Sequence, residues 1–157
     1  ITLNKKGVKK VNYEFNSNIK INLYYNKEYK KTSKFKKGKS YSHTLNPDIS
    51  LELFKNDDLF GILHFDSKYK MTESGQFKTE DLNKMHAYKD AIIGSYGSYI
   101  LGPLEDDINI FTSEEQSNGK RFPSVGAISF QINNCAKGLN NFWNLVEEFI
   151  DMADNSD

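Results

Sequence analysis

The sequence contains one cysteine, one arginine, three histidines and no long apolar run. A single cysteine, Cys135, cannot form a disulfide within the chain, which fits a reducing cytoplasm. So few cysteine and histidine side chains also disfavour a structural zinc site. No apolar run approaches the roughly 20 residues that a membrane-spanning helix needs. We therefore expect a cytoplasmic protein with no membrane partner.

Motifs of several common enzyme classes are missing as well. There is no G-x-S-x-G elbow, and Cys135 lies in a plain I-N-N-C-A-K-G stretch, which disfavours serine and cysteine hydrolases. Neither a P-loop nor G-x-G-x-x-G occurs, so nothing in the sequence supports nucleotide binding.

The composition is that of a folded domain. The chain has 157 residues, of which 38% are hydrophobic and 27% charged. This is enough to bury a core and too apolar for disorder. We expect a single domain over residues 1–157. Because the chain begins with Ile1 rather than methionine, we also expect it to be the C-terminal fragment of a longer protein.

The net charge is zero, but positive and negative side chains are unevenly distributed along the sequence. The excess charge is +10 in residues 1–46, −3 in residues 47–102 and −7 in residues 103–157. A basic region can bind a polyanion even in a neutral chain. The alternative is a lysine-rich surface with no polyanion ligand, since the chain has twenty lysines and one arginine. Both alternatives explain the basic residues 1–46 equally well. Residues 26–40 predict a basic loop whose Lys36 and Lys37 would contact DNA.

Hydrophobic periodicity predicts the elements of an α/β or α+β domain. Alternating apolar residues predict strands at residues 11–15, 19–23 and 49–53, the first two joined by a turn at 16–18. The nearly continuous apolar run 59–65 predicts a central strand that is buried on both faces. Further short strands are expected at residues 98–101, 108–111 and 125–131.

Two helices are predicted. The first has Thr79 as its N-cap and ends near Gly94, so it crosses between strands. The second covers residues 138–152 and is amphipathic. Its apolar side consists of Phe142, Leu145, Val146, Phe149 and Ile150.

Candidate catalytic residues lie at strand ends. Asp48 precedes the strand at 49–54, and Asp66 ends the strand at 59–66. If these two strands form a hairpin, the two carboxylates meet at one edge of the sheet. Alternation places Lys68 on the same face as Asp66, while Ser67 points the other way.

This group suits hydrolysis of a phosphodiester. Two neighbouring carboxylates, with the backbone carbonyl of Ser67, favour Mg²⁺ or Mn²⁺. Such a metal binds a phosphate oxygen and activates water, and Lys68 would orient that water or stabilise the developing charge. The alternative is structural: Asp48 would be a turn or cap residue, and Lys68 would belong to a solvated strand end.

The first helix adds candidates for DNA contacts. Lys84 and Tyr88 are four residues apart and share a face, which would point a cation and a phenol at a phosphate backbone. His86 is a candidate phosphate contact or proton donor. In the alternative interpretation Tyr88 belongs to the core and His86 is an ordinary surface histidine.

Taken together, these motifs resemble the PD-(D/E)XK nuclease superfamily. They are N-P-D at 46–48, F-D-S-K-Y at 65–69, D-L-N-K-M-H-A-Y at 81–88 with Y-K-D-A-I at 88–92, and V-G-A-I at 125–128. The similarity is greatest to a branch of prokaryotic proteins related to McrC, the nuclease subunit of modification-dependent restriction systems. The resemblance covers roughly residues 40–131.

The resemblance implies a restriction-endonuclease-like fold, a mixed sheet flanked by helices. It implies Asp48 and Asp66 as metal ligands and Lys68 as the catalytic lysine of a Mg²⁺- or Mn²⁺-dependent DNA endonuclease in defence against foreign DNA. Lys84 stands where many relatives have glutamine. Many relatives also carry a metal-site glutamate on a helix before the first strand, and residues 1–40 predict no such helix.

The resemblance also implies partners. A McrB-like AAA+ motor subunit would supply translocation, and double-strand cleavage implies two active sites and hence a homodimer or paired complex. Two other functions stay open: a catalytically silent nucleic-acid-binding or scaffold domain of the same fold, and a phosphodiesterase that acts on RNA or branched DNA.

Overall fold

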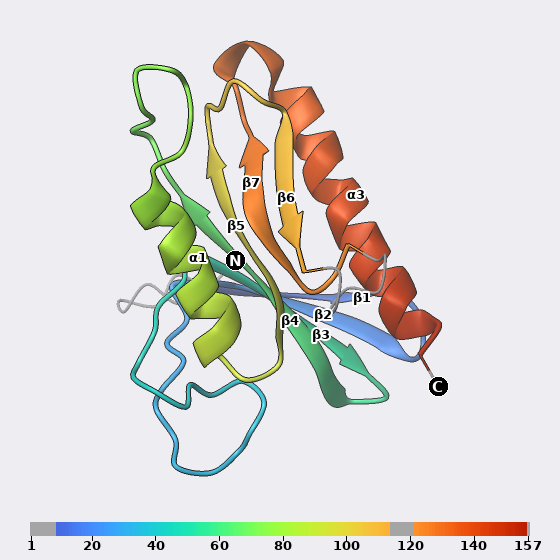
Figure 1. Cartoon of the computed structure of the whole chain (residues 1–157). Helices are drawn as coiled ribbons and strands as arrows, with labels where there is room; N and C mark the ends of the chain where they lie inside the picture. The colour runs from blue at the N-terminus through green and yellow to red at the C-terminus, as the bar shows by residue number, and fades with distance from the viewer. Residues whose placement is uncertain (1–8, 114–120, 157) are drawn as a thin grey trace.

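The structure, a computed structural model, describes residues 9–113 and 121–156 and has a seven-stranded mixed sheet with helices on both faces (Figure 1). The strand order across the sheet is β1-β2-β3-β4-β5-β7-β6. The strands are β1 Lys9–Glu14, β2 Ile19–Tyr25, β3 Ile49–Lys55, β4 Asp58–Ser67, β5 Ser95–Gly102, β6 Ile108–Thr112 and β7 Ser124–Ser129. The helices are α1 Thr79–Ala91, the short 3₁₀ helix η1 Ile132–Asn134 and α3 Cys135–Asp154. The predicted α/β class is confirmed.

The first four strands form an antiparallel meander. β1 and β2 are joined at the predicted turn, and β3 and β4 form the predicted hairpin, with Ile49 opposite Phe65. Between β2 and β3 the chain leaves the sheet over residues 26–48, which we call the β2–β3 loop. The loop returns beside its starting point, because Asn26 N donates a hydrogen bond to Asp48 O (2.8 Å).

The other half of the sheet is built by parallel pairing. β4 pairs with β5 after a crossover through α1, and β5 pairs with β7. The C-terminal ends of β4, β5 and β7 therefore lie at one edge of the sheet, at the top in Figure 1. β6 completes the sheet antiparallel to β7.

Successive side chains of β4 point to opposite faces of the sheet. Leu63 and Phe65 belong to the core beneath α3, whereas Ile62 belongs to the core beneath α1. α3 packs with the predicted apolar side: Leu145, Val146, Phe149 and Ile150 are buried and Phe142 packs against them. Among the described residues, no helix is long and apolar enough to cross a membrane.

Both helices begin differently from the prediction. Thr79 is the first residue of α1 rather than its N-cap, which is Lys78 and forms no side-chain capping bond. α3 begins at Cys135, before Gly138. Gly138 permits close packing, since a Cβ there would lie 2.3 Å from the backbone oxygen of Ser129. This glycine therefore serves the contact between helix and strand and does not mark the helix start.

Candidate active site

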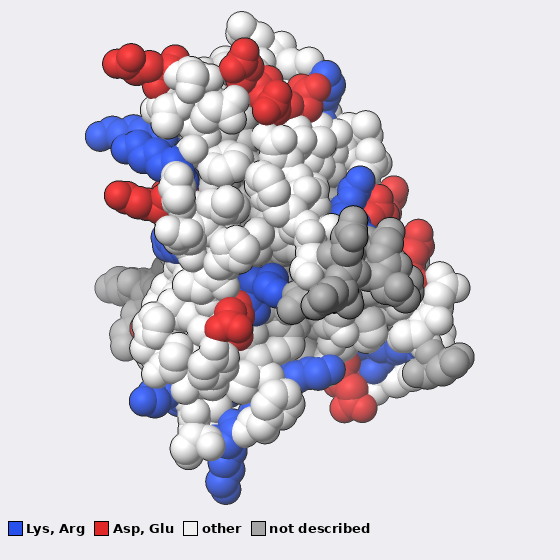
Figure 2. Space-filling model, in the orientation of Figure 1, with Lys and Arg blue, Asp and Glu red and all other residues white. Residues whose placement is uncertain are grey.

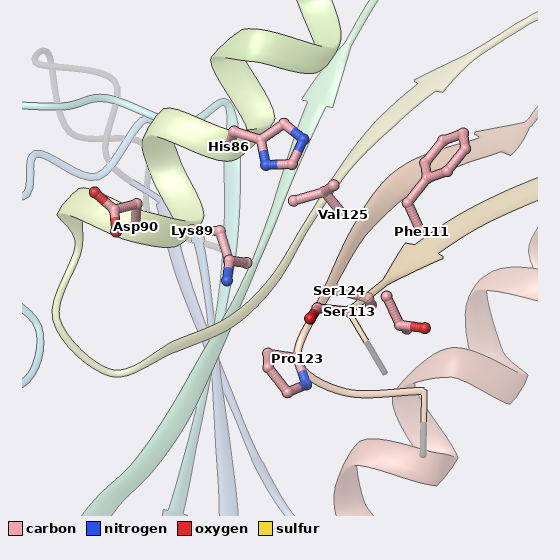
Figure 3. Close-up of a pocket in the computed structure, with 9 residues that line it drawn as sticks. His86, Lys89, Asp90, Phe111, Ser113, Pro123, Ser124 and Val125 are labelled. Carbon is pink, nitrogen blue, oxygen red and sulfur yellow. The ribbon is translucent and has the colours of Figure 1, made fainter. Parts of the chain in front are cut away.

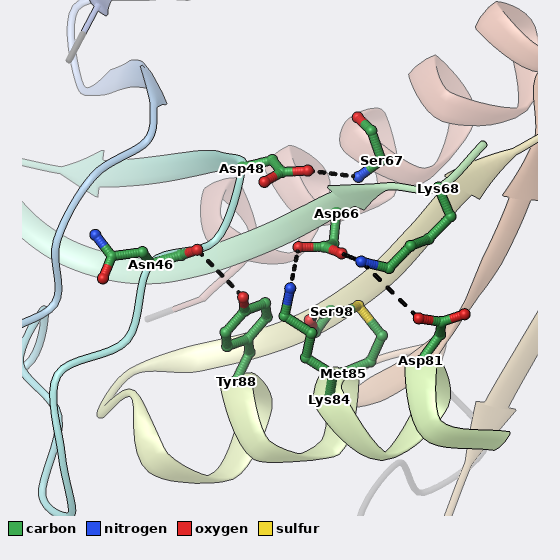
Figure 4. A network of polar contacts seen from close by, with 10 residues as sticks. All are labelled: Asn46, Asp48, Asp66, Ser67, Lys68, Asp81, Lys84, Met85, Tyr88 and Ser98. Carbon is green, nitrogen blue, oxygen red and sulfur yellow. Dashed lines mark hydrogen bonds and ion pairs between the residues drawn. The ribbon is translucent and has the colours of Figure 1, made fainter. Parts of the chain in front are cut away.

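Asp48 and Asp66 lie next to each other because β3 begins where β4 ends. The antiparallel register sets Ile49 opposite Phe65, so the residues just beyond this pair meet at the sheet edge. Asp48 Oδ2 accepts a hydrogen bond from Ser67 N at 2.9 Å (Figure 4). The hairpin thus brings the two carboxylates to one edge.

The Asp66 carboxylate is fully buried and lies between two lysines (Figure 4). Lys68 Nζ is 2.5 Å from Oδ2, and Lys84 Nζ donates a hydrogen bond to Oδ1 at 2.9 Å. Lys68 Nζ also lies 3.9 Å from the carboxylate of Asp81. A buried carboxylate needs such partners, because desolvation of an unpaired charge is very unfavourable.

The backbone of Lys68 is held by the neighbouring strand. Lys68 N donates a hydrogen bond to Leu101 O (2.8 Å), which continues the parallel pairing just beyond the end of β4. A Cβ at Gly102 would come within 2.7 Å of Lys68 O. The missing side chain at position 102 therefore allows the close approach that sets the position of the lysine.

One stripe of α1 faces the site. Asp81, Lys84 and Tyr88 are spaced three and four residues apart, so they lie on the same side of the helix. The hydroxyl of Tyr88 donates a hydrogen bond to Asn46 O (3.2 Å), which ties the helix to the end of the β2–β3 loop.

The electrostatics of this stripe keep Lys84 cationic and Tyr88 neutral. Partial burial alone would lower the pKa of Lys84, but its contacts with Asp66 and Tyr88 outweigh this and raise the pKa. Burial raises the pKa of Tyr88. Lys84 is therefore a permanent positive charge beside Asp66, and Tyr88 is a hydrogen-bond donor.

The donor set fits a hard divalent cation. Asp66 Oδ2 is buried and has no hydrogen-bond partner, although Lys68 Nζ contacts it as an ion pair. The other oxygen donors at this edge are the carboxylate of Asp48 and the backbone carbonyl of Ser67. Among the described residues, no group of three or more His, Cys, Asp or Glu side chains could hold a metal. Mg²⁺ matches such a sparse set, because it retains several waters and binds through one or two carboxylates.

The structure separates the other predicted DNA contacts from this cluster. His86 is exposed and lines a pocket of about 530 Å³ between α1 and the edge formed by β6 and β7 (Figure 3). Lys36 is exposed in the β2–β3 loop. Lys37 Nζ donates hydrogen bonds to the backbone oxygens of Leu59 and Phe60 (both 3.1 Å), near the opposite end of β4 from Asp66. Their roles stay predictions.

A second polar cluster, which the sequence did not predict, lies beneath the same helix. Glu52 is 3% exposed, forms an ion pair with Lys27 and accepts a hydrogen bond from the Tyr29 hydroxyl (3.1 Å). His64 is fully buried between the hydroxyls of Ser50 (3.0 Å) and Ser95 (2.8 Å). Alternation from Asp48 would have placed Ser50 and Glu52 on the face of the site, but it gives no indication that Lys27 and Tyr29 cover them.

Comparison with known proteins gives one match. A family model described as the PD-(D/E)XK nuclease superfamily matches residues 1–107, which include every residue of the cluster around Asp66. No curated protein and no solved structure matches the chain. The match and the mixed sheet flanked by helices agree with the predicted restriction-endonuclease-like fold.

Proposed function

Because the chain belongs to the PD-(D/E)XK nuclease superfamily, we propose that it is a metal-dependent DNA endonuclease domain with its centre at Asp48, Asp66 and Lys68. The observation that supports this most directly is the buried Asp66 carboxylate, which has Lys68 at 2.5 Å and Asp48 bonded to the adjacent backbone amide. A buried acid with two cations is costly to maintain for structure alone.

Each residue of the cluster has a proposed role. Asp48, Asp66 and the carbonyl of Ser67 hold Mg²⁺ or Mn²⁺, in keeping with the divalent ions that nucleases of this superfamily generally use. When bound, such an ion supplies Lewis-acid stabilisation of phosphate charge and eases deprotonation of water. Lys68 stabilises the negative charge that develops on the phosphate and orients the attacking water.

Residues of α1 would position the substrate. Lys84, held as a cation beside Asp66, binds a neighbouring phosphate of the DNA backbone. Tyr88 keeps the helix in register with the loop that ends at Asp48, through its hydrogen bond to Asn46. His86 would contact DNA from another side of the same helix, the side that faces β6 and β7.

The proposal also assigns the chain to a branch of the superfamily and names its partners. The M-H-A-Y helix and the F-D-S-K-Y strand favour the McrC-related branch and a role in restriction and defence. A McrB-like AAA+ motor and a second copy of the chain are the proposed partners. We also propose one domain over residues 1–157, because Ile128 and Phe149 share a core with Leu51 and Phe65.

One observation favours the alternative of a catalytically silent nucleic-acid-binding domain. Both carboxylate oxygens of Asp66 contact a lysine, so the site has internal cations where a metal would bind. Such a domain would bind DNA but never cut it, whatever divalent metal is added.

Nicking of supercoiled plasmid with Mg²⁺ or Mn²⁺ tests the proposal. Lys68→Ala should lower the nicking rate by at least about 100-fold, the typical effect of removing one group that stabilises a transition state. Lys70→Ala is the matched control, since Lys70 is exposed two residues later, and it should retain the rate within a few-fold. DNA binding without nicking in the unmodified protein, or equal nicking by both variants, would refute a nuclease centre at Lys68.

A further inference from the structure

The β2–β3 loop has an unusual combination of side chains. Residues 27–39 contain seven lysines and a single acidic residue, Glu28. In the middle of this stretch the ring of Phe35 is 86% exposed, between Lys34 and Lys36. A partner that covered this ring would gain free energy, because the contact removes apolar surface from water.

The loop is a fixed surface rather than a loose tether. Tyr29 pairs with Leu45, and both Tyr29 and Ser40 are fully buried. The backbone of Ser40 also bridges to Ile92 at the end of α1, and Lys37 is bonded to carbonyls of β4. Phe35 therefore lies in a loop whose position is fixed by contacts on both sides of it.

Other lysines of the loop are available to a ligand. Lys30, Lys31, Lys34 and Lys36 are exposed, and none of their ammonium groups forms an ion pair or hydrogen bond with the described residues. In Figure 2 the lower end of the molecule, where the loop lies in Figure 1, carries mostly blue side chains, whereas the upper end carries mostly red ones. The ligand of this surface should be an anion with several charges.

The exposed ring narrows the choice of ligand. Lysines suit the phosphates of any nucleic acid, but an aromatic side chain stacks on a base only where the face of that base is free. The bases of an intact double helix are already stacked on each other. Phe35 therefore favours an unpaired strand over a duplex.

We propose that the β2–β3 loop binds a single-stranded segment of nucleic acid, with a base on Phe35 and phosphates on the surrounding lysines. The loop begins and ends beside Asp48, at the hydrogen-bonded pair Asn26 and Asp48. Its Lys37 lies near the opposite end of β4 from Asp66, so this surface is separate from the cluster around Asp66. The proposed binding surface is formed by the loop alone and does not depend on the proposed nuclease function.

Fluorescence anisotropy in EDTA tests binding without cleavage. The probes are a labelled 20-nucleotide single-stranded DNA, the RNA of the same sequence and the blunt DNA duplex. Phe35→Ala should raise the Kd for a single strand about 10-fold, within the range measured for one stacked base. The duplex Kd should change less than about 2-fold, because no base of the duplex stacks on Phe35.

Two further variants complete the test. Phe35→Tyr keeps the ring and should bind like the unmodified protein, and Trp143→Ala removes an exposed ring from α3 and should have no effect. An equal loss on DNA and RNA strands, or a loss on either one, supports the surface. Absence of single-strand binding, or equal losses on single strand and duplex, overturns it. Plasmid nicking is measured separately, so a silent nuclease centre leaves this result intact.

Discussion

The face of the sheet beneath α3 and the face beneath α1 draw on the same strands but bury different side chains. Beneath α3, the strands contribute apolar groups such as Leu63 and Phe65. Beneath α1, the same segment of β4 contributes His64 and Asp66, both fully buried. α3 accordingly packs with a continuous apolar side, whereas α1 contributes few buried residues and a stripe of polar and charged ones.

The difference shows how one sheet separates stability from chemistry. The apolar face gains free energy from the area that it removes from water. The polar face is tolerated because its buried groups have partners: Asp66 has two lysines, Glu52 has Lys27 and a phenol, and His64 has two hydroxyls. Damage to the two faces should therefore have different consequences.

The largest loss of stability is expected from Phe149→Ala, beneath α3. Phe149 is fully buried against the rings of Phe60, Tyr96 and Phe122, and its truncation should cost about 3–5 kcal/mol. Nicking per folded molecule should stay unchanged at low temperature, because the residue is on the face away from Asp66. Urea denaturation and the plasmid assay measure both quantities, with Leu139→Ala as the exposed control on α3. Lost nicking in the folded protein would mean that the two faces are coupled.

A smaller effect is expected from Glu52→Gln, beneath α1. This change removes the charge that pairs with Lys27 in a nearly buried site and should cost about 2 kcal/mol. Unlike Phe149→Ala, it should also slow nicking, because the Lys27–Glu52 pair anchors the loop that ends at Asp48. Glu147→Gln, at an exposed position of α3, is the matched control. Normal nicking by a destabilised Glu52→Gln protein would show that the loop position does not depend on this ion pair.

The smallest effect is a pH dependence of the free energy of unfolding, which we expect from His64 on the polar face beneath α1. Burial, followed by the charge of Lys27, lowers the pKa of His64 from 6.5 to about 3. The unfolded chain therefore binds a proton below pH 6.5 that the folded chain does not, so the stability is fully present above pH 6.5 and is lost as the pH falls. Between pH 7.5 and 5.5 the free energy of unfolding should fall by about 1.4 kcal/mol from this group.

Denaturation at several pH values measures this contribution as a difference between variants. His64→Gln should remove it from the pH profile, whereas His86→Gln, at an exposed position, should leave the profile as it is. Parallel profiles for the unmodified protein and His64→Gln would contradict a neutral buried histidine.

Much of the fold could be predicted from the sequence where the signals are local. The alternation in β2 and β3, the apolar run of β4 and the spacing of α3 each reflect what one element buries, so single-sequence patterns suffice. The contact between Asp66 and Lys68 was predictable for the same reason, since two residues in alternation share a face. Asp48 was added to this pair on the assumption that the strands at 49–54 and 59–66 form a hairpin, which they do.

Contacts between distant segments could not be predicted from such local patterns. Glu52 and Lys27 are 25 residues apart in the sequence. The polar residues of β3 give no indication that the β2–β3 loop covers this side of the strand. Asp81 was overlooked although it lies on the stripe of Lys84 and Tyr88, because at the start of a helix an acid is already explained by the dipole. The predicted start of α3 was wrong because Gly138 lies inside the helix, where the absence of a side chain permits close packing against Ser129.

The return of the β2–β3 loop to its own starting point makes the loop a module. Asn26 and Asp48 are hydrogen-bonded to each other, so the sheet continues as though the residues between them were an insertion. Closing a longer loop costs little, about 0.6 kcal/mol for each doubling of its length. Evolution could therefore lengthen, shorten or exchange this segment, and with it the molecule's choice of ligands, while the strands that carry Asp66 and Lys68 stay in register.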